Sequence, residues 1–201
     1  KNNYRINEKI KSFKNTNNTQ SNPNSIKRAA KLISNSSKGI IIVGGGIKYT
    51  SGFKPVIELA EYLNVPIVTA AGHGDAIPFN HKLNAGQMGP RGNPVATKLT
   101  KEADIILAIG TRLGFNSTFY SFENINKRAK IIQVELEKKM LGRYFPIKIG
   151  INADAATTAN QLLIEFKKQK IKTEVKTWTD NYKKERSNYL FQRNSIFAKN
   201  F

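Results

Sequence analysis

The sequence predicts an α/β fold, a doubly wound parallel sheet of five or six strands with helices on both faces. Its strands read as continuous β-branched runs, and these runs alternate with segments whose apolar residues recur at helical spacing. The first run, GIIIV at 39–43, breaks into the three glycines 44–46. Glycines there let the backbone turn tightly before a helix begins. Right-handed crossovers then lay helices on both faces, which makes the expected architecture Rossmann-like.

The first half of the chain predicts two helices, each followed by a strand. Residues 25–33 place apolar side chains on one helical face behind Ser25, a candidate N-cap, and lead into the strand 39–43. Residues 51–64 again carry apolar positions at helical spacing, and 65–72 follow as a second strand that ends in small residues. The two strands and the helix between them form a βαβ unit.

The second half continues the alternation. Asn93 before Pro94, and Asp154 before an apolar periodic segment, are the expected N-caps. The expected elements are a helix over 93–103, a strand over 104–110, a short helix over 122–129, strands over 130–137 and 147–151, and a helix over 154–168.

The composition divides the 201 residues into three parts. An Asn-rich polar N-terminal linker covers 1–23, one domain covers 24–170, and a basic, partly helical C-terminal linker covers 171–201. The absence of cysteine excludes disulfides and thiolate sites and favours a reducing, cytoplasmic location. No apolar run approaches the ~20 residues of a membrane span, so we expect no membrane partner.

The net charge of +19 raises the question of nucleic-acid binding. Residues 1–38 carry nine Lys or Arg and one acid, and 156–201 carry ten and four, whereas 39–155 carry fourteen and nine. The excess therefore lies mainly in the flanks, and no aromatic-basic reader motif accompanies it. We expect a solvated basic surface rather than a nucleic-acid groove. A stand-alone basic binding module stays open as an alternative.

Ligands of such sheets bind beyond the carboxyl ends of the strands, where this chain places small residues and one arginine. Arg112 offers a planar fork suited to a phosphate. A bound ligand and plain packing both explain small residues at these turns.

Several catalytic and nucleotide motifs are absent. The pattern that starts at Gly44 would need glycine where Tyr49 stands, the second strand lacks the acid that holds a ribose, and there is no Walker loop or Gly-x-Ser-x-Gly elbow. His73, Asp75 and His81 share one loop, and two histidines around a proline turn are more often loop residues than metal ligands. The residues alone therefore predict no catalytic group and no metal site.

Four segments carry a resemblance to a known family. They are PVIELAEYLNVPIVTAAG at 55–72, AGQMGPRGNPVATKLTKEADIILAIGTRLG at 85–114, RAKIIQVELEKKMLG at 128–142 and GINADA at 150–155. Together they resemble the central domain of thiamine diphosphate-dependent enzymes of the acetolactate synthase group, over roughly residues 24–166.

The resemblance implies that the chemistry lies outside this region. Enzymes of this family have a pyrimidine-binding domain with an activating glutamate, a central domain, and a diphosphate-binding domain with a Gly-Asp-Gly motif for magnesium. The nearest string here is Gly74-Asp75-Ala76. Thiamine diphosphate and Mg²⁺ would thus be bound by other domains of the parent. The partners would be flanking domains of the same polypeptide, in a homodimer or homotetramer. The parent would be an acetyltransferase or, alternatively, an acetolactate synthase-like or oxalyl-CoA decarboxylase-like enzyme.

In flavin-containing relatives the central domain holds a dinucleotide at its strand ends, so the resemblance implies a site for FAD or ADP. By position it would comprise Gly46, Ala70, Ala71, Gly89, Arg91, Gly110, Thr111, Arg112, Glu135, Leu136, Asp154 and Ala155. Three departures stand out: Glu135 replaces an aspartate, Leu113-Gly114 replaces phenylalanine-aspartate, and Arg91 replaces a histidine. They leave an ADP-type or a vestigial pocket open beside a flavin site.

Overall fold

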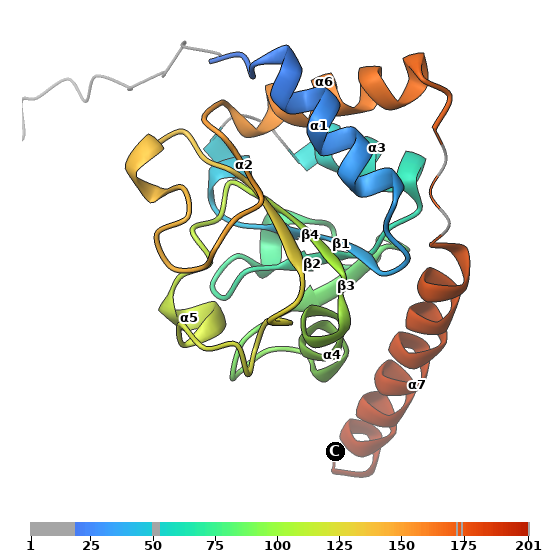
Figure 1. The fold of residues 1–201 in the computed structure, drawn as a ribbon. Coiled ribbons are helices and arrows are strands. Elements are labelled where there is room, and N and C mark those ends of the chain that lie inside the picture. The colour runs from blue at the N-terminus through green and yellow to red at the C-terminus, as the bar shows by residue number, and fades with distance from the viewer. Residues whose placement is uncertain (1–18, 50–52, 172, 174, 201) are drawn as a thin grey trace, which may run out of the picture.

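A computed structural model describes residues 19–49, 53–171, 173 and 175–200 of the chain. Its centre is a six-stranded, fully parallel sheet in the order β3-β2-β1-β4-β5-β6 (Figure 1). The strands are β1 (Gly39–Val43), β2 (Ile67–Thr69), β3 (Asn84–Gln87), β4 (Ile105–Ile109), β5 (Lys130–Val134) and β6 (Ile149–Ile151). The α/β class with a doubly wound sheet is confirmed. Most of the N-terminal linker, residues 1–18, lies outside the described residues.

The direction of winding reverses between β1 and β4. From β1 the chain steps to β2 and β3 at one edge, then returns to β4 and steps to β5 and β6 at the other. Ile42 of β1 accordingly has Val68 of β2 on one side and Ala108 of β4 on the other. In open parallel sheets the crevice at such a reversal is where ligands bind.

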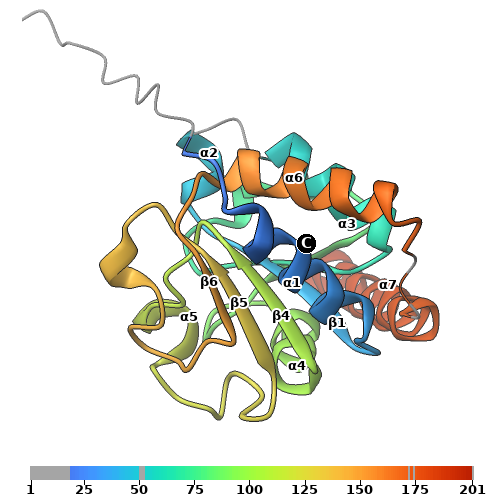
Figure 2. The ribbon, with the colours of Figure 1, turned by 45° about the horizontal axis from the view of Figure 1, so that its top comes forward.

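Three helices cover one face of the sheet. They are α1 (Pro23–Ser34), α3 (Phe53–Leu63) and α6 (Ala155–Lys168), which Figure 2 shows as one layer above the strands. Ile26, Leu59 and Phe166, one from each helix, are buried in one cluster with Ile41 and Leu107 of the strands. Alternate strand residues therefore supply this half of the core.

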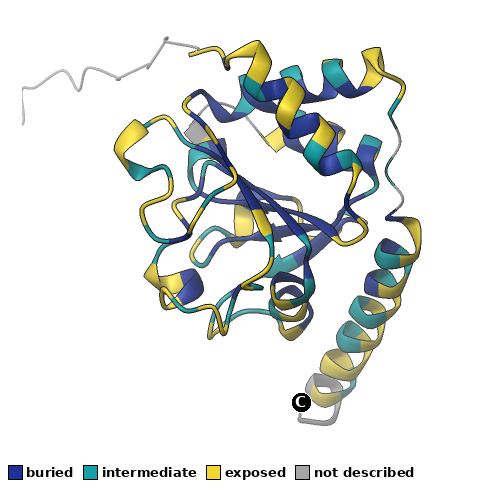
Figure 3. Ribbon diagram, in the orientation of Figure 1, coloured by how far each residue is buried: buried dark blue, intermediate teal, exposed yellow. Residues whose placement is uncertain are grey.

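The opposite face is covered by α4 (Pro94–Glu102) and part of α7 (Lys176–Asn200). Ile40 and Ile42 of β1 meet Leu99 of α4 and Tyr182 of α7 in this second cluster. Figure 3 shows the strands buried between the two layers and one side of α7 exposed to solvent. A parallel sheet needs both faces covered, and α7 supplies part of the second cover.

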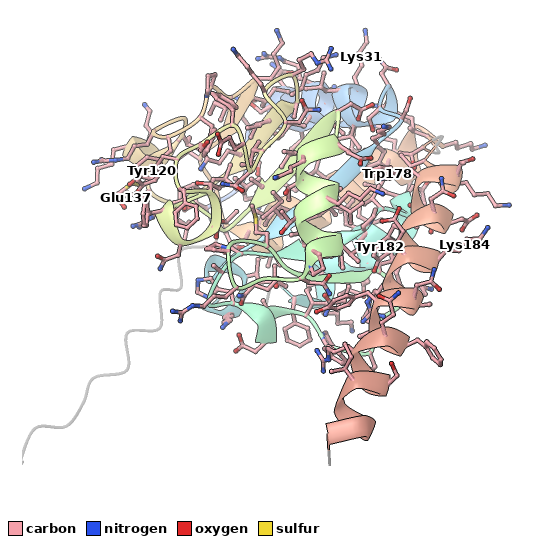
Figure 4. The ribbon with its side chains drawn as sticks, turned by 90° about the horizontal axis from the view of Figure 1, so that it is seen from below. Lys31, Tyr120, Glu137, Trp178, Tyr182 and Lys184 are labelled. Atoms are coloured by element: carbon pink, nitrogen blue, oxygen red, sulfur yellow. The ribbon has the colours of Figure 1, made fainter. Side chains whose placement is uncertain are left out.

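The N-terminal part of α7 is fixed to the domain by polar contacts as well. The Trp178 indole N–H donates to the carbonyl of Gly39 at 3.1 Å, and Lys98 of α4 pairs with Glu185 at 2.6 Å. In Figure 4 Trp178 and Tyr182 point from α7 toward α4, whereas Lys184 points away from the domain. Part of the segment expected to be a linker is thus packed into the core.

Side-chain caps fix the starts of three helices. Asn93 and Asp154 cap α4 and α6 as the sequence predicts, through bonds to Val95 N and Thr157 N, both 2.8 Å. The cap of α1 is Asn22 rather than Ser25, because Pro23 occupies the first turn and Asn22 accepts from the amide of Asn24. None of the helices that the structure describes is long and apolar enough to cross a membrane.

One expected helix is wrong, and one strand was not expected. The segment 122–129 forms turns rather than a helix, because Asn126 binds backbone groups with its side chain: Nδ2 donates to Ala103 O, and Oδ1 accepts from Arg128 N. The strand β3 carries no β-branched residue, so periodicity misses it. It forms because the free edge of β2 pairs with its backbone.

Tyr182 provides a stability test. Its side chain is buried, its hydroxyl has no hydrogen-bond partner among the described residues, and burial raises the pKa of that hydroxyl. We expect Tyr182→Phe to raise the unfolding free energy by about 1 kcal/mol, because an unsatisfied buried group is removed. Tyr182→Ala should lower it by about 3–5 kcal/mol, since a large cavity is created.

Urea denaturation measures both changes. The matched control is Lys184→Ala on the exposed side of α7, with an expected effect within about 0.5 kcal/mol. A loss of stability in Tyr182→Phe would show that the hydroxyl has a partner in solution.

Candidate functional site: a cleft at the sheet reversal

A cleft of about 630 Å³ opens at the carboxyl ends of β1 and β4. Three consecutive glycines after β1, the turn after β4 and the loop after β5 form its floor and sides. The lining residues are Gly44, Gly45, Gly46, Ala70, Ala71, His73, Gly110, Thr111, Arg112, Gly114, Phe115, Asn116, Ser117, Glu135, Leu136 and Glu137. The cleft therefore lies at the reversal point of the sheet, where ligands of this fold bind.

The turn after β1 packs directly on the turn after β4. A Cβ built on Gly46 would lie 2.7 Å from Gly110 Cα, and one on Gly44 would lie 2.6 Å from Gly110 O. The amide of Gly46 donates to Gly110 O at 3.0 Å, and Gly110 itself has φ +59°. Close backbone packing by itself thus accounts for glycine at 44, 46 and 110.

His73 covers the middle glycine. A Cβ on Gly45 would meet the imidazole of His73 at 2.8 Å, and the His73 Nδ1 atom is buried without a hydrogen-bond partner in the described parts of the chain. The sequence treated His73 as a loop residue, and only the close approach of its ring to Gly45 brings it to the cleft.

The charged groups of the cleft are paired with one another. Arg112 Nη2 donates to Glu137 Oε2 at 2.9 Å, and Arg112 Nε lies 3.9 Å from Glu135 Oε2. Lys139 also bonds the Glu137 carboxylate, at 2.7 Å. The hydrogen bond from Lys139, and then the positive charge of Lys139 and Arg112, hold the pKa of Glu137 below its usual range. Both partners of Arg112 are thus carboxylates, and Glu137 is ionised at neutral pH.

An exposed aromatic group forms the rim of the cleft on the side of α5 (Phe115–Thr118), where Tyr120 and Glu137 are labelled in Figure 4. The ring of Phe115 lies 5.0 Å from that of Phe119, and Tyr120 stacks on Tyr144 at 4.4 Å. Phe115 is 52% exposed and also lines the cleft. One exposed aromatic ring, that of Phe115, is therefore available to a ligand beside the charged groups.

The cleft brings together most of the site residues expected from the sequence, namely Gly46, Ala70, Ala71, Gly110, Thr111, Arg112, Glu135 and Leu136. Four others lie outside it. Gly89 and Arg91 belong to the loop after β3, where Arg91 is exposed. Asp154 and Ala155 are buried, and the Asp154 carboxylate caps α6.

Sequence reasoning missed Phe115, Asn116, Ser117, Glu137 and His73. They lie one to five residues beyond the expected site residues Ala71, Arg112 and Leu136, in turns whose path the sequence does not give.

Comparison with protein families decides the identity of the domain. The family model for the central domain of thiamine pyrophosphate enzymes matches residues 26–162, from α1 to α6. The chain belongs to this family, and the matched region is the central domain. The region that matches the family of thiamine pyrophosphate enzymes contains β1 to β6, which together form the whole sheet.

Individual relatives agree with this assignment. The chain is 36% identical to sulfoacetaldehyde acetyltransferase of Roseovarius nubinhibens over 140 residues, which are 69% of this chain and 23% of the relative. It is 30% identical to a probable acetolactate synthase large subunit of Methanocaldococcus jannaschii over 162 residues, 81% of this chain and 27% of the relative. The chain thus spans about a quarter of the length of the thiamine pyrophosphate enzymes that it matches.

The cleft of this central domain has the size of a small-molecule site. Its volume lies within the roughly 300–1,000 Å³ of such sites, and a carboxylate at a strand end, such as that of Glu135, suits ribose hydroxyls. A diphosphate would meet an Arg112 already paired with Glu137, and the amides of Gly44 and Gly46 already donate to Ile109 O and Gly110 O. The lining therefore offers an acceptor for sugar hydroxyls, whereas these three donors for a phosphate are engaged within the fold.

Metal-ion clusters are not found in the described part of the chain. Among residues 19–49, 53–171, 173 and 175–200, no group of three or more His, Cys, Asp or Glu side chains could hold a metal ion.

The glycine turn gives the test of this site. We expect Gly46→Ala to lower the unfolding free energy by about 1–3 kcal/mol, because the added Cβ meets the Gly110 backbone, which has no flexible end to move.

The matched control is Gly114→Ala in the same cleft. Gly114 has φ −73° and an added Cβ meets nothing within 4 Å, so we expect a change within about 0.5 kcal/mol. Thermal or urea unfolding of both variants distinguishes the two positions, and equal effects would refute the close packing of the turns.

Proposed function

We propose that this chain is a noncatalytic central domain in a longer, cytoplasmic acetyltransferase. The described residues support this: the charged groups of the cleft are paired with one another, and His73 is its one imidazole. In this proposal the thiamine diphosphate and Mg²⁺ of the parent enzyme are bound by its flanking domains, in a homodimer or homotetramer. The central domain then separates the flanking domains as a rigid spacer and contains a ligand-binding cleft.

The proposed reaction of the parent converts sulfoacetaldehyde and phosphate into acetyl phosphate and sulfite. The observation that carries it is the 36% identity to sulfoacetaldehyde acetyltransferase, against 30% to the acetolactate synthase relative over a similar stretch. The segments GTRLG at 110–114 and GINADA at 150–155 also resemble that acetyltransferase. An acetolactate synthase-like or oxalyl-CoA decarboxylase-like parent is the alternative.

For the cleft we propose a ligand with an adenosine group. The family resemblance offers ADP and FAD as candidates, and the lining residues favour only the adenosine part that both share. The Glu135 carboxylate, the Phe115 ring and the small residues Ala70 and Ala71 support the adenosine part of this proposal. The ligand would stabilise the domain rather than react.

The activity of the parent polypeptide tests the main proposal. With sulfoacetaldehyde, phosphate, thiamine diphosphate and Mg²⁺, we expect stoichiometric release of sulfite and formation of acetyl phosphate. Omission of phosphate should abolish acetyl phosphate formation. Conversion of pyruvate to acetolactate without sulfite release from sulfoacetaldehyde would instead favour the acetolactate synthase-like alternative.

The noncatalytic role has its own test on the 201-residue chain. Because the described residues offer no metal-ion cluster, calorimetric titration with thiamine diphosphate and Mg²⁺ should show no binding heat. Micromolar affinity would contradict the assignment of cofactor binding to other domains.

A further inference from the structure

The cleft contains a carboxylate pair that a phosphate-binding site would avoid. Glu135 and Glu137 both line it, and Arg112 is the one cation among its lining residues. The Arg112 guanidinium is bonded to Glu137 and close to Glu135, so its charge is already compensated. Lys139, which pairs with Glu137, is not part of the lining. The lining side chains therefore carry more negative than positive charge.

Three backbone amides at the strand ends are already bonded within the fold. The amide of Gly44 donates to Ile109 O at 3.2 Å and that of Gly46 to Gly110 O at 3.0 Å. The amide of Ala71, at the end of the next strand, donates to Ser117 Oγ at 2.9 Å. Phosphate-binding turns instead direct such amides at the ligand. These three donors are used by the fold itself.

The remaining surface of the cleft suits a flat aromatic base that is attached to a sugar with free hydroxyl groups. Phe115 is 52% and Leu136 43% exposed, and both line the cleft beside small residues. Aromatic rings stack favourably on such a wall. Carboxylates are acceptors, so Glu135 can receive hydrogen bonds from sugar hydroxyls.

We propose that this cleft selects uncharged nucleosides over nucleotide diphosphates, and that Glu137 is the residue that sets this selection. The proposal rests on the adenine-bearing ligand proposed above and assigns its class. A diphosphate at Arg112 would compete with Glu137 for the guanidinium charge and would lie beside two like-charged carboxylates. A nucleoside leaves the Arg112–Glu137 pair intact.

Glu137→Gln separates the two ligand classes. The amide keeps the size of the side chain and removes its negative charge, which weakens the bond to Arg112 and removes the repulsion of a phosphate. We expect the variant to bind ADP about tenfold more tightly than the natural chain, as for removal of one like charge from a half-exposed site, with adenosine affinity changed less than about twofold.

The measurement is isothermal titration of the 201-residue chain with adenosine and with ADP, in EDTA so that no magnesium complex forms. The matched control is Glu58→Gln, an exposed glutamate of α3 outside the cleft lining, which makes the same charge change. This control should bind adenosine and ADP with affinities within about twofold of those of the natural chain. Circular dichroism confirms that each variant is folded.

Each outcome decides between the proposals. Adenosine affinity equal to or above that of ADP in the natural chain, with the tightening confined to ADP in Glu137→Gln, supports the selection. Tighter binding of ADP than adenosine in the natural chain, or no effect of Glu137→Gln on ADP, overturns the selection but keeps the adenine cleft. If neither compound binds any variant at millimolar concentration, the adenine cleft and the selection are both wrong.

Discussion

The contact between the turns after β1 and β4 is the constraint on which the rest of the structure depends. Gly44 and Gly46 bring one backbone against Gly110 of the other at a separation that leaves no room for a side chain. This contact closes the carboxyl end of the two central strands, where the winding of the sheet reverses. It thereby fixes the floor of the cleft and places the residues after β5 beside it. The same glycines that resemble a nucleotide-binding turn thus serve the packing of the sheet.

The second requirement of the fold is cover for both faces of a fully buried sheet. One face receives three helices that are contiguous with the domain in the sequence. The other receives α4 and the beginning of α7, whose Tyr182 is among the largest fully buried side chains. A helix that follows the region matched by the family model therefore contributes to the stability of the domain. The distal part of α7 extends beyond this contact, with Phe191 76% exposed.

Net charge gives a poor description of the cleft. The chain carries +19 overall, yet the side chains around its cleft include more carboxylates than cations. The two facts are compatible because most of the basic excess lies in the flanks, and because Arg112 and Glu137 neutralise each other. Interactions between exposed charges are screened beyond about 10 Å, so a ligand in the cleft responds mainly to the nearest groups. Function at this site follows from local pairing.

The sequence by itself determined the class of fold, the parallel sheet and the family, because β-branched runs and helical periodicity are local properties and the family motifs follow the strands in order. It also determined the caps Asn93 and Asp154, which act within one helical turn. Only the tertiary structure decided β3, whose pairing depends on the exposed edge of β2, and the burial of Tyr182, which requires a distant sheet face. The tertiary structure likewise decided that Arg112 is paired with Glu137, 25 residues further along the chain. The sequence gives the chemical nature of each side chain, but the conformation of the loops decides which interaction partner it has.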